Sequence, residues 1–151
     1  MKIVELLAKE CILLDIDVKE KEQVWGLLAE CLQSSGAVTD VKEYLEAVRK
    51  RETLGTTGVG FGVAIPHAES TAVTRAALAM AKLKEGVDVA SLDGSRADLF
   101  FLIAAPLRGE NVHLQALSKL ARMLVHDTFL NALRAAKSVD EVLEVIQARD
   151  E

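Results

Sequence analysis

The sequence has few of the residues that build disulfide frameworks or metal clusters, and it has no long hydrophobic run. Only two of its 151 residues are cysteine, and the separation of Cys11 and Cys31 matches no metal-binding or redox spacing. We therefore expect free, buried thiols, as is usual in a cytosolic protein. No stretch is long and apolar enough to span a bilayer, and the charged N-terminus does not resemble a signal peptide. We expect a cytoplasmic protein that does not insert into a membrane.

Aromatic residues are also scarce, at 4% of the chain, whereas 50% of the residues are hydrophobic and 27% are charged. This ordinary soluble composition predicts a core built from Leu, Val, Ile and Ala. The length is that of one domain, which we expect to span residues 1–151. The formal net charge of −5 argues against non-specific binding to nucleic acid or to anionic membranes.

The first third of the chain predicts a helical turn over residues 2–7 and a short buried strand over residues 11–14. A helix is predicted to open at Asp17, because Glu20 three residues later would complete a capping box. Gly36 stands where the left-handed residue that ends this helix is wanted.

A second helix is predicted from Thr39 or Asp40 to Arg51, where cations suit the negative end of the helix dipole. Its apolar stripe consists of four residues: Val41, Tyr44, Leu45 and Val48.

The middle of the chain predicts strands. Residues 63–65 form a short apolar run that Pro66 ends, because proline cannot donate to a strand ladder. Residues 76–83 are rich in alanine and would allow a helix, but their short, bounded run favours a strand. The continuous apolar run over residues 98–105, which ends at Pro106, is typical of a central strand covered on both faces.

Three helices are predicted to close the chain, over residues 111–124, from Asp127, and from Ser138 with Glu141 as its capping-box partner. Strands flanked by helices on both sides in sequence indicate a sheet covered on both faces. The expected inward residues are Leu114, Leu117, Ala121 and Leu124 in the first helix, Phe129, Leu130 and Leu133 in the second, and Val142, Val145 and Ile146 in the third.

The stretch over residues 51–67 is the most distinctive in the sequence. It carries glycines at 55, 58, 60 and 62, passes through the short strand, and places His67 directly after Pro66. A histidine delivered in this way to a strand end is placed to be reached by a partner. The alternative is a loop histidine that fills a polar notch.

An imidazole with an ordinary pKa near 6.5 is an unprotonated nucleophile near neutral pH, so His67 could accept a phosphoryl group and release it again. Such a transfer needs mainly alignment and charge stabilisation, and the glycine stretch could turn backbone N–H groups toward the phosphate oxygens. The stretch has neither the order of a P-loop nor that of a dinucleotide fingerprint, so no nucleotide cofactor is expected.

Two other side chains are candidates around His67. Arg51 is the nearest upstream cation and could bind phosphate bidentately. From its position alone, a solvated charge that closes the helix is the better interpretation. His113 lies in the first turn of its helix, where the dipole favours a neutral ring able to donate one hydrogen bond. A local backbone interaction is the alternative for His113, and we interpret His126 as structural.

Two other chemistries find little support in the pattern. A zinc site would need His67, His113 and His126 together, without short ligand spacing or an evident acidic or cysteine partner. A serine hydrolase would need a nucleophile elbow, which is absent.

The residues around His67 resemble the signature of the type-2 enzyme IIA domains of the bacterial phosphoenolpyruvate-dependent phosphotransferase system. The likeness rests on Ala-Ile-Pro-His-Ala at 64–68, Arg-Glu at 51–52 and Gly-Thr-Thr-Gly at 55–58. A second landmark is Leu-Ile-Ala-Ala-Pro at 102–106 leading to His-Leu-Gln-Ala-Leu at 113–117. Within this family, we expect the chain to resemble the nitrogen-regulatory branch.

This resemblance implies an α/β (α+β) fold, in which a mixed sheet of about five strands lies between helices as in the mannitol/fructose-type IIA fold. It implies that His67 is phosphorylated, that Arg51 steadies the phosphoryl group, and that His113 sits beside it, with no metal or cofactor. The donor would be phospho-HPr or its nitrogen-branch relative.

Two functions remain open on these grounds. In the first, the chain is a sugar-specific IIA phosphotransferase that passes the phosphoryl group from His67 to a IIB protein during carbohydrate uptake. In the second, it is a nitrogen-type regulatory module that binds partner proteins according to its phosphorylation state, because a phosphoryl group adds up to about two negative charges. The chain shows no fused IIB domain, which favours the regulatory branch as an expectation.

Overall fold

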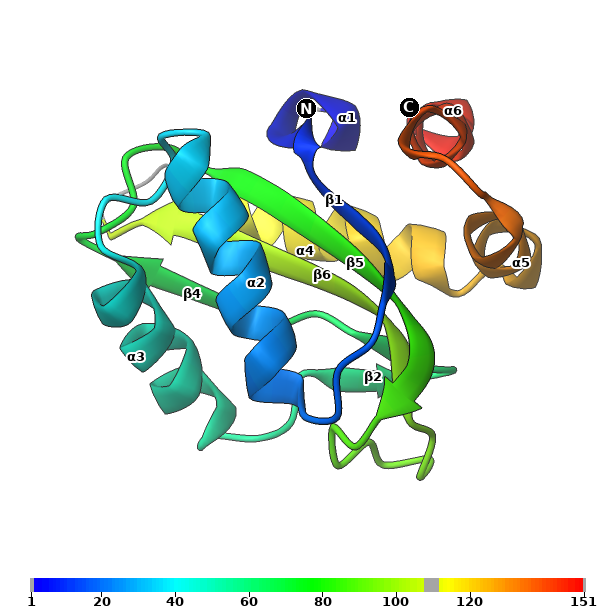
Figure 1. Ribbon diagram of the computed structural model, residues 1–151, viewed down its shortest axis with the longest axis horizontal. Helices are drawn as coiled ribbons and strands as arrows, with labels where there is room; N and C mark the ends of the chain where they lie inside the picture. Colours follow the sequence, from blue (N-terminus) through cyan, green and yellow to red (C-terminus); the bar gives the residue numbers. More distant parts are fainter. Residues whose placement is uncertain (1, 108–111, 151) are drawn as a thin grey trace.

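The computed structural model describes residues 2–107 and 112–150, and for residues 112 and 113 the backbone only. Most of its strands follow one another in the middle of the chain, with helices before and after them, as expected (Figure 1). The helices are α1 (Ile3–Leu6), α2 (Lys21–Ser34), α3 (Val41–Glu52), α4 (Val112–Leu124), α5 (Asp127–Ala135) and α6 (Val139–Arg149). The strands are β1 (Leu7–Ile16), β2 (Gly58–Gly60), β3 (Val63–Ala64), β4 (His67–Ser70), β5 (Ala77–Val87) and β6 (Ala97–Pro106).

The six strands form one mixed sheet in the order β1-β5-β6-β3-β2, and β4 also pairs with β6. β5 and β6 are antiparallel, whereas β1 is parallel to β5, and β3 and β4 are both parallel to β6. The predicted mixed sheet is confirmed. It has six strands rather than about five because Pro66 separates β3 from β4 along the same edge of β6.

Helices cover both faces of the sheet (Figure 1). Helices α2 and α3 pack on one face, and α1, α4, α5 and α6 pack on the other. Alternation along β6 divides its side chains between the two cores, with Phe100 and Leu102 toward α2 and α3, and Phe101 and Ile103 toward the other layer. The prediction of a central strand covered on both faces is therefore confirmed.

The alanine-rich run forms strand β5, as the sequence analysis expected. Ala77, Ala79 and Ala81 point toward α2 and α3, and Leu78 and Met80 point toward the opposite layer. Small side chains on one face let the helices approach closely, and the ladders to β1 and β6 supply the backbone hydrogen bonds that a helix would have made internally. Tertiary pairing thus overrides the helix propensity of alanine.

The predicted start of α2 is wrong by one turn. Strand β1 runs on to Ile16, so Asp17 cannot open a helix. The capping box is instead formed by Glu20 and Gln23, whose side-chain oxygen accepts the N–H groups of Lys19 and Glu20 at 2.9 and 3.0 Å. The left-handed Gly36, with φ of 87°, is confirmed.

The predicted inward face of α4 is also partly wrong. Leu114 is 53% exposed and Ala121 is exposed, whereas Leu124 is buried as expected. The residues that face the core are Ala116, Leu120, Met123 and Leu124. The helix is turned because it packs against α1 and α5 as well as the sheet, and this rotation leaves its first turns at the edge of the sheet.

The remaining predictions on helices hold more closely. Asp40 caps α3, accepting from Glu43 N at 3.1 Å, and Ser138 caps α6, accepting from Glu141 N at the same distance. Every residue expected inward in α5 is buried, whereas in α6 Val145 is only half-buried. Cys11 and Cys31 are free thiols, the first buried and the second half-buried, and burial raises the pKa of both.

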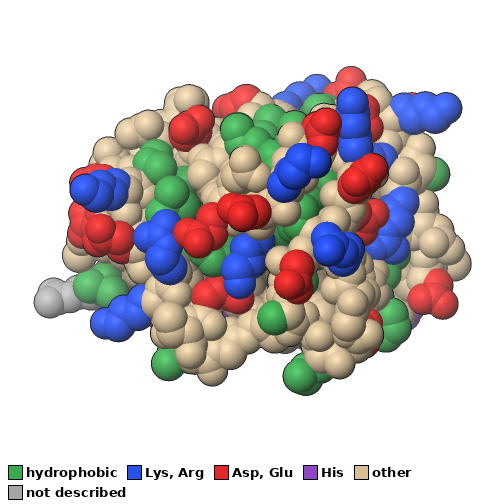
Figure 2. Space-filling view, turned by 60° about the horizontal axis from the view of Figure 1, so that its bottom comes forward, with side chains coloured by type: hydrophobic (Ala, Val, Ile, Leu, Met, Phe, Trp, Pro, Cys, Tyr) green, Lys and Arg blue, Asp and Glu red, His purple; other side chains and the backbone are tan. Residues whose placement is uncertain are grey.

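The surface carries mixed charge. Figure 2 shows acidic and basic side chains interspersed over one face, with hydrophobic side chains between them. Within the described residues, no helix combines the length and apolar character needed to cross a membrane.

A tight hairpin joins β2 to β3, where Gly60, Phe61 and Gly62 all have positive φ, at 92°, 58° and 78°. Phe61 is held there at both backbone groups. Its N–H donates to Asp93 Oδ2 at 2.9 Å, and its carbonyl accepts from Arg134 Nη2 at 2.7 Å. These bonds offset the cost of a left-handed conformation in a residue with a side chain.

Asp150 ties the two ends of the chain together. Its buried carboxylate accepts the N–H groups of Ile3 and Val4 at 2.9 Å each, and it pairs with Lys119 Nζ at 2.6 Å. Burial by itself would raise the pKa of the Asp150 carboxyl. The hydrogen bonds from Lys119, Val4 and Ile3 outweigh this effect and hold the pKa below its ordinary value.

We expect Asp150→Asn to lower the free energy of unfolding at pH 7 by about 3 kcal/mol, because the buried Lys119 ammonium loses its counter-charge. Urea unfolding of the two proteins measures this. The matched control is Asp140→Asn, since the Lys9–Asp140 pair at 2.8 Å is exposed on both sides and should leave the unfolding midpoint almost unchanged. Equal unfolding midpoints for wild type and Asp150→Asn would show that the Asp150 carboxylate does not stabilise the fold.

The lowered pKa of the Asp150 carboxyl also predicts that the stability of the protein depends on pH. Because its pKa is lower in the folded than in the unfolded chain, its contribution to stability is complete above about pH 4 and is lost as the pH falls further. Unfolding midpoints measured between pH 2 and pH 7 should fall in this acid range for wild type, and fall less steeply for Asp150→Asn. Parallel curves for the two proteins would show that Asp150 does not carry the effect.

Gly58 is expected to tolerate no side chain. A Cβ at this position would lie 2.6 Å from both Ser91 Oγ and Val89 Cγ2, so Gly58→Ala should cost about 1–3 kcal/mol of stability through overpacking. Gly26, inside α2, has no such neighbours, and Gly26→Ala should stabilise the protein by up to about 1 kcal/mol. Thermal unfolding of the two variants checks both signs, and a Gly58→Ala protein as stable as wild type would disprove the close packing.

Candidate functional site

The site is organised by an interruption in one edge of the sheet. Strands β3 and β4 both lie parallel to β6, with Ala64 opposite Phe100 and His67 opposite Ile103. Between them, the Pro66 carbonyl accepts the Ile103 N–H at 3.0 Å. The chain therefore keeps its alignment on β6 across the proline.

His67 was expected at the exit of a strand, and this expectation is only half right. The histidine does follow the short strand and Pro66, but it is the first residue of the next strand, β4. The reason is that β6 extends to Pro106 and offers ladder partners beyond the proline. His67 is held by a sheet edge rather than by a free loop.

The half-buried His67 ring has a defined tautomer. Its Nδ1 lies 2.8 Å from the carbonyl oxygen of Ile65. A carbonyl oxygen can only accept a hydrogen bond, so Nδ1 carries the proton and Nε2 bears the lone pair of the neutral ring. The nucleophilic atom of the imidazole is therefore Nε2.

His67 lines a hollow of about 360 Å³ between α3, β4 and α4. Arg51 and Lys50 reach it from the end of α3, and Leu114 and Leu117 reach it from α4. Leu114, which was expected inward, thus faces this hollow, whereas Leu117 lines the hollow and also packs against the core as expected. Its full lining is Ala47, Lys50, Arg51, Leu54, His67, Ala68, Glu69, Leu114 and Leu117.

The structure brings Arg51 and His67, which the sequence analysis singled out, to the same hollow. Arg51 Nη1 donates to the Gly55 carbonyl oxygen at 3.0 Å, and its side chain is only half-buried. A guanidinium retains further donors when one is engaged, so Arg51 can also meet an anion.

The third candidate, His113, belongs to the first turn of α4, but its side chain lies outside the described residues. Its position beside His67 therefore stays a prediction. The neighbouring Leu114 lines the hollow, so the start of α4 is close to the site.

The glycine stretch does not form the expected anion-binding nest. The N–H of Gly58 donates to Thr56 Oγ1 at 2.9 Å, that of Phe61 to Asp93 Oδ2 at 2.9 Å, and that of Gly62 to Ser95 Oγ at 3.1 Å. No glycine lines the hollow among the described residues. The glycines serve the turn and its close packing, and the interpretation of a phosphate cradle was wrong for these three amides.

Sequence reasoning missed the contacts of Glu52. Its carboxylate accepts the Thr57 N–H at 3.1 and 3.3 Å and also the Thr57 hydroxyl, and it lies 3.8 Å from Lys21 Nζ. Arg51 and Glu52 are adjacent, yet the arginine turns to the hollow and the glutamate turns to the loop after α3. The signal for this role was the pairing of Arg-Glu with Gly-Thr-Thr-Gly in one motif.

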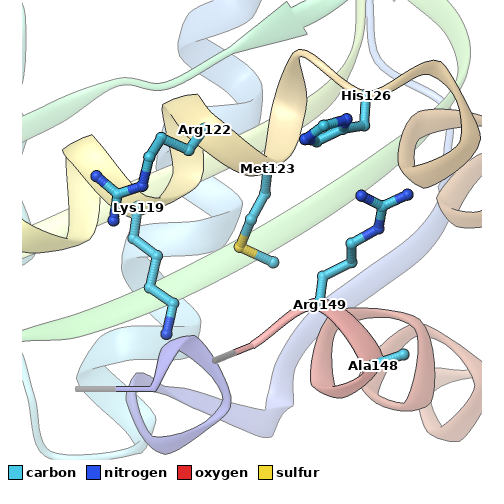
Figure 3. A pocket seen from close by; sticks show the side chains of 6 residues that line it. All are labelled: Lys119, Arg122, Met123, His126, Ala148 and Arg149. Atoms are coloured by element: carbon cyan, nitrogen blue, oxygen red, sulfur yellow. The ribbon is translucent and has the colours of Figure 1, made fainter.

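His126 lies in a different place. It lines a second hollow with Arg149, at which Lys119 and Arg122 of α4 also lie (Figure 3). This hollow shares no lining residue with the one at His67. In the part of the chain that the structure describes, no three His, Cys, Asp or Glu side chains come close enough to hold a metal ion.

Comparisons with known proteins show the family to which the chain is similar. Residues 5–149 match the model of the family described as phosphoenolpyruvate-dependent sugar phosphotransferase system, EIIA 2. The chain is 42% identical over 150 residues to the PTS system fructose-specific EIIABC component of Bacillus subtilis, covering 99% of this chain but only 24% of that protein. It is 35% identical to the nitrogen regulatory protein of Bradyrhizobium diazoefficiens, covering 97% of this chain and 95% of that protein.

A solved structure shows the same fold at full length. The nitrogen regulatory protein IIA-Ntr from Neisseria meningitidis is 30% identical, with a TM-score of 0.87, and the match covers 94% of this chain and 97% of that one. With its mixed sheet, its helix layers and an imidazole at the broken edge strand, the chain belongs to the EIIA type-2 family of the phosphotransferase system, whose members carry out phosphoryl transfer.

Proposed function

We propose that His67 accepts a phosphoryl group on Nε2 from an HPr-type phosphocarrier protein and later releases it. The observation that carries the proposal is the hydrogen bond between His67 Nδ1 and the Ile65 carbonyl, because it makes Nε2 the nitrogen that bears the lone pair of the neutral ring. That lone pair forms a new N–P bond while the donor's N–P bond breaks, and the electron pair of the broken bond returns to the donor imidazole. No proton has to move, since Nδ1–H keeps its partner throughout.

The surroundings of His67 supply what the transfer needs. Phosphoryl transfer depends mainly on alignment and on stabilising charge at the equatorial oxygens. Arg51 and Lys50 place two positive charges at the hollow, and Arg51 is the residue we assign to the phosphoryl group. We assign His113 to the same site as a neutral donor, and no metal or cofactor enters the scheme.

The phosphorylated protein has two candidate roles. In the first, the protein is a cytoplasmic regulator of the nitrogen type that binds partner proteins according to its phosphorylation state. The likeness to nitrogen regulatory proteins over nearly their full length supports this reading. In the second, it is a sugar-specific IIA component that passes the group to a IIB protein, which the higher identity to a fructose-specific relative supports.

We predict that His67→Ala abolishes labelling when the protein is incubated with labelled phosphoenolpyruvate, enzyme I and HPr. The nucleophile is then missing, so no stable label can form. The matched control is His126→Ala, which removes a histidine from the second hollow and should label at the wild-type rate. Undiminished labelling of the His67→Ala protein would disprove the assignment.

Arg51→Ala is predicted to slow transfer to the protein by about a hundredfold, which is the usual cost of losing one group that stabilises transition-state charge. Its unfolding midpoint should match that of wild type, since the Arg51 side chain is only half-buried. Arg49→Ala is the control, because Arg49 lies in the same last turn but pairs with Glu22 at 2.8 Å. Equal transfer rates for the Arg51 and Arg49 variants would remove Arg51 from the site.

A second step of the same assay distinguishes the regulatory role from the sugar-specific role. Labelled protein is offered to purified IIB proteins of the fructose and mannitol classes. Rapid loss of label to one of them supports the sugar route, whereas stable label together with phosphorylation-dependent capture of another protein supports regulation.

A further inference from the structure

We propose that Glu52 is a positioning residue for His67, acting through Thr57 and the backbone of Ile65. This inference rests on the proposed function and identifies what holds the reactive imidazole in its orientation. It comes from a continuous set of contacts that begins at the end of α3 and ends at the His67 ring.

The first contact is the clamp between Glu52 and Thr57. Both oxygens of the Glu52 carboxylate accept the Thr57 N–H, and one of them also accepts the Thr57 hydroxyl. The Glu52 side chain is only 9% exposed and Thr57 only 6%. A buried carboxylate that receives several hydrogen bonds constrains its partner strongly, because water cannot take over the lost contacts.

The second contact connects Thr57 to the backbone of Ile65, and through it to His67. The Thr57 carbonyl oxygen accepts the Ile65 N–H at 2.9 Å, and the Ile65 carbonyl oxygen in turn accepts the His67 Nδ1–H at 2.8 Å. Both polar backbone groups of Ile65 therefore have partners. The N–H group fixes the orientation of the Ile65 backbone against Thr57, and the carbonyl group fixes the His67 ring. Ile65 is buried, at 4% exposure.

The geometry of the edge explains why this support is needed. The backbone groups of Ile65 and Pro66 point to opposite sides of the extended chain. Ile65 therefore makes the last backbone bond on the Thr57 side before His67. On the other side, the Pro66 carbonyl accepts from Ile103. The orientation of the Ile65 carbonyl, and with it the tautomer of His67, depends on where Thr57 is held.

The adjacency of Glu52 and Arg51 gives the clamp a second effect. Arg51 reaches the hollow from the last turn of α3, and the clamp joins that turn to the segment that presents His67. The Glu52 carboxylate thus sets the position of His67, the proposed nucleophile, relative to Arg51, the cation that would bind the phosphoryl oxygens. Misplacement of reacting groups by about 1 Å can cost on the order of a hundredfold in rate.

The test compares Glu52→Ala with Glu52→Gln, which keeps one acceptor oxygen. The first readout is the ¹⁵N chemical shifts of the two His67 ring nitrogens, measured by NMR above the pKa of the ring. We expect the Nδ1–H tautomer to dominate in wild type and in Glu52→Gln, and a mixture of tautomers in Glu52→Ala. The second readout is the rate of transfer from phospho-HPr, expected to fall by about tenfold or more in Glu52→Ala and by much less in Glu52→Gln.

The matched control is Glu43→Ala. Glu43 lies on the same helix, and its carboxylate also accepts a threonine hydroxyl, that of Thr71 at 2.7 Å, but this pair is exposed and off the path to Ile65. Both readouts should stay at the wild-type values in Glu43→Ala. If Glu52→Ala does not fold, Thr57→Val and Thr57→Ser replace it, and Thr57→Ser should restore the wild-type readouts because it keeps the hydroxyl.

A folded Glu52→Ala protein with the wild-type tautomer and transfer rate would overturn the proposal. So would loss of stability in that variant without any change in the ring-nitrogen shifts, because this result would assign Glu52 a structural role only. If wild type itself takes no label, the proposed function fails, but the tautomer measurement does not depend on transfer and still decides the role of Glu52.

Discussion

The geometry of the site depends on one hydrogen bond, that between the His67 ring and the carbonyl of Ile65. It fixes which ring nitrogen carries a proton, and so which can form a bond to phosphorus. The bond exists because Pro66 interrupts the edge strand while β6 keeps the chain aligned on both sides of the interruption. A strand without the proline would present a regular backbone ladder here, and a free loop would not hold the ring.

The rest of the fold supports this edge from two directions. Helix α3 delivers a cation to the hollow and a carboxylate to the loop behind it, and the start of α4 delivers apolar side chains. Between them, Tyr44 of α3 is buried and donates from its hydroxyl to the Ile103 carbonyl at 2.7 Å, directly opposite His67 in the sheet. Burial raises the pKa of Tyr44, so the hydroxyl stays protonated and remains a donor.

Some elements of the fold follow from local sequence patterns, and others depend on segments far away in the chain. Local patterns were sufficient for the elements with strong periodicity or clear caps, such as β6 and the start of α3 at Asp40. They failed where a distant segment decided the outcome. Strand β1 continued past its apolar core because β5 offered a parallel partner, which displaced the cap of α2 from Asp17 to Glu20. The face of α4 turned because α1 and α5 also pack on it, and this turn brought Leu114 and Leu117 to the hollow.

By itself, the sequence determined the fold class, the family and the one imidazole around which the site is built, because these follow from periodicity and from a motif contiguous in the chain. Only the tertiary structure decided that Arg51 and His67 share a hollow, that the amides of Gly58, Phe61 and Gly62 bind side chains instead of an anion, and that Glu52 reaches His67 through Thr57 and Ile65. The physical reason is that a hydrogen bond depends on the direction and distance of two groups. For residues far apart in the chain, those are set by how the sheet and its two helix layers pack.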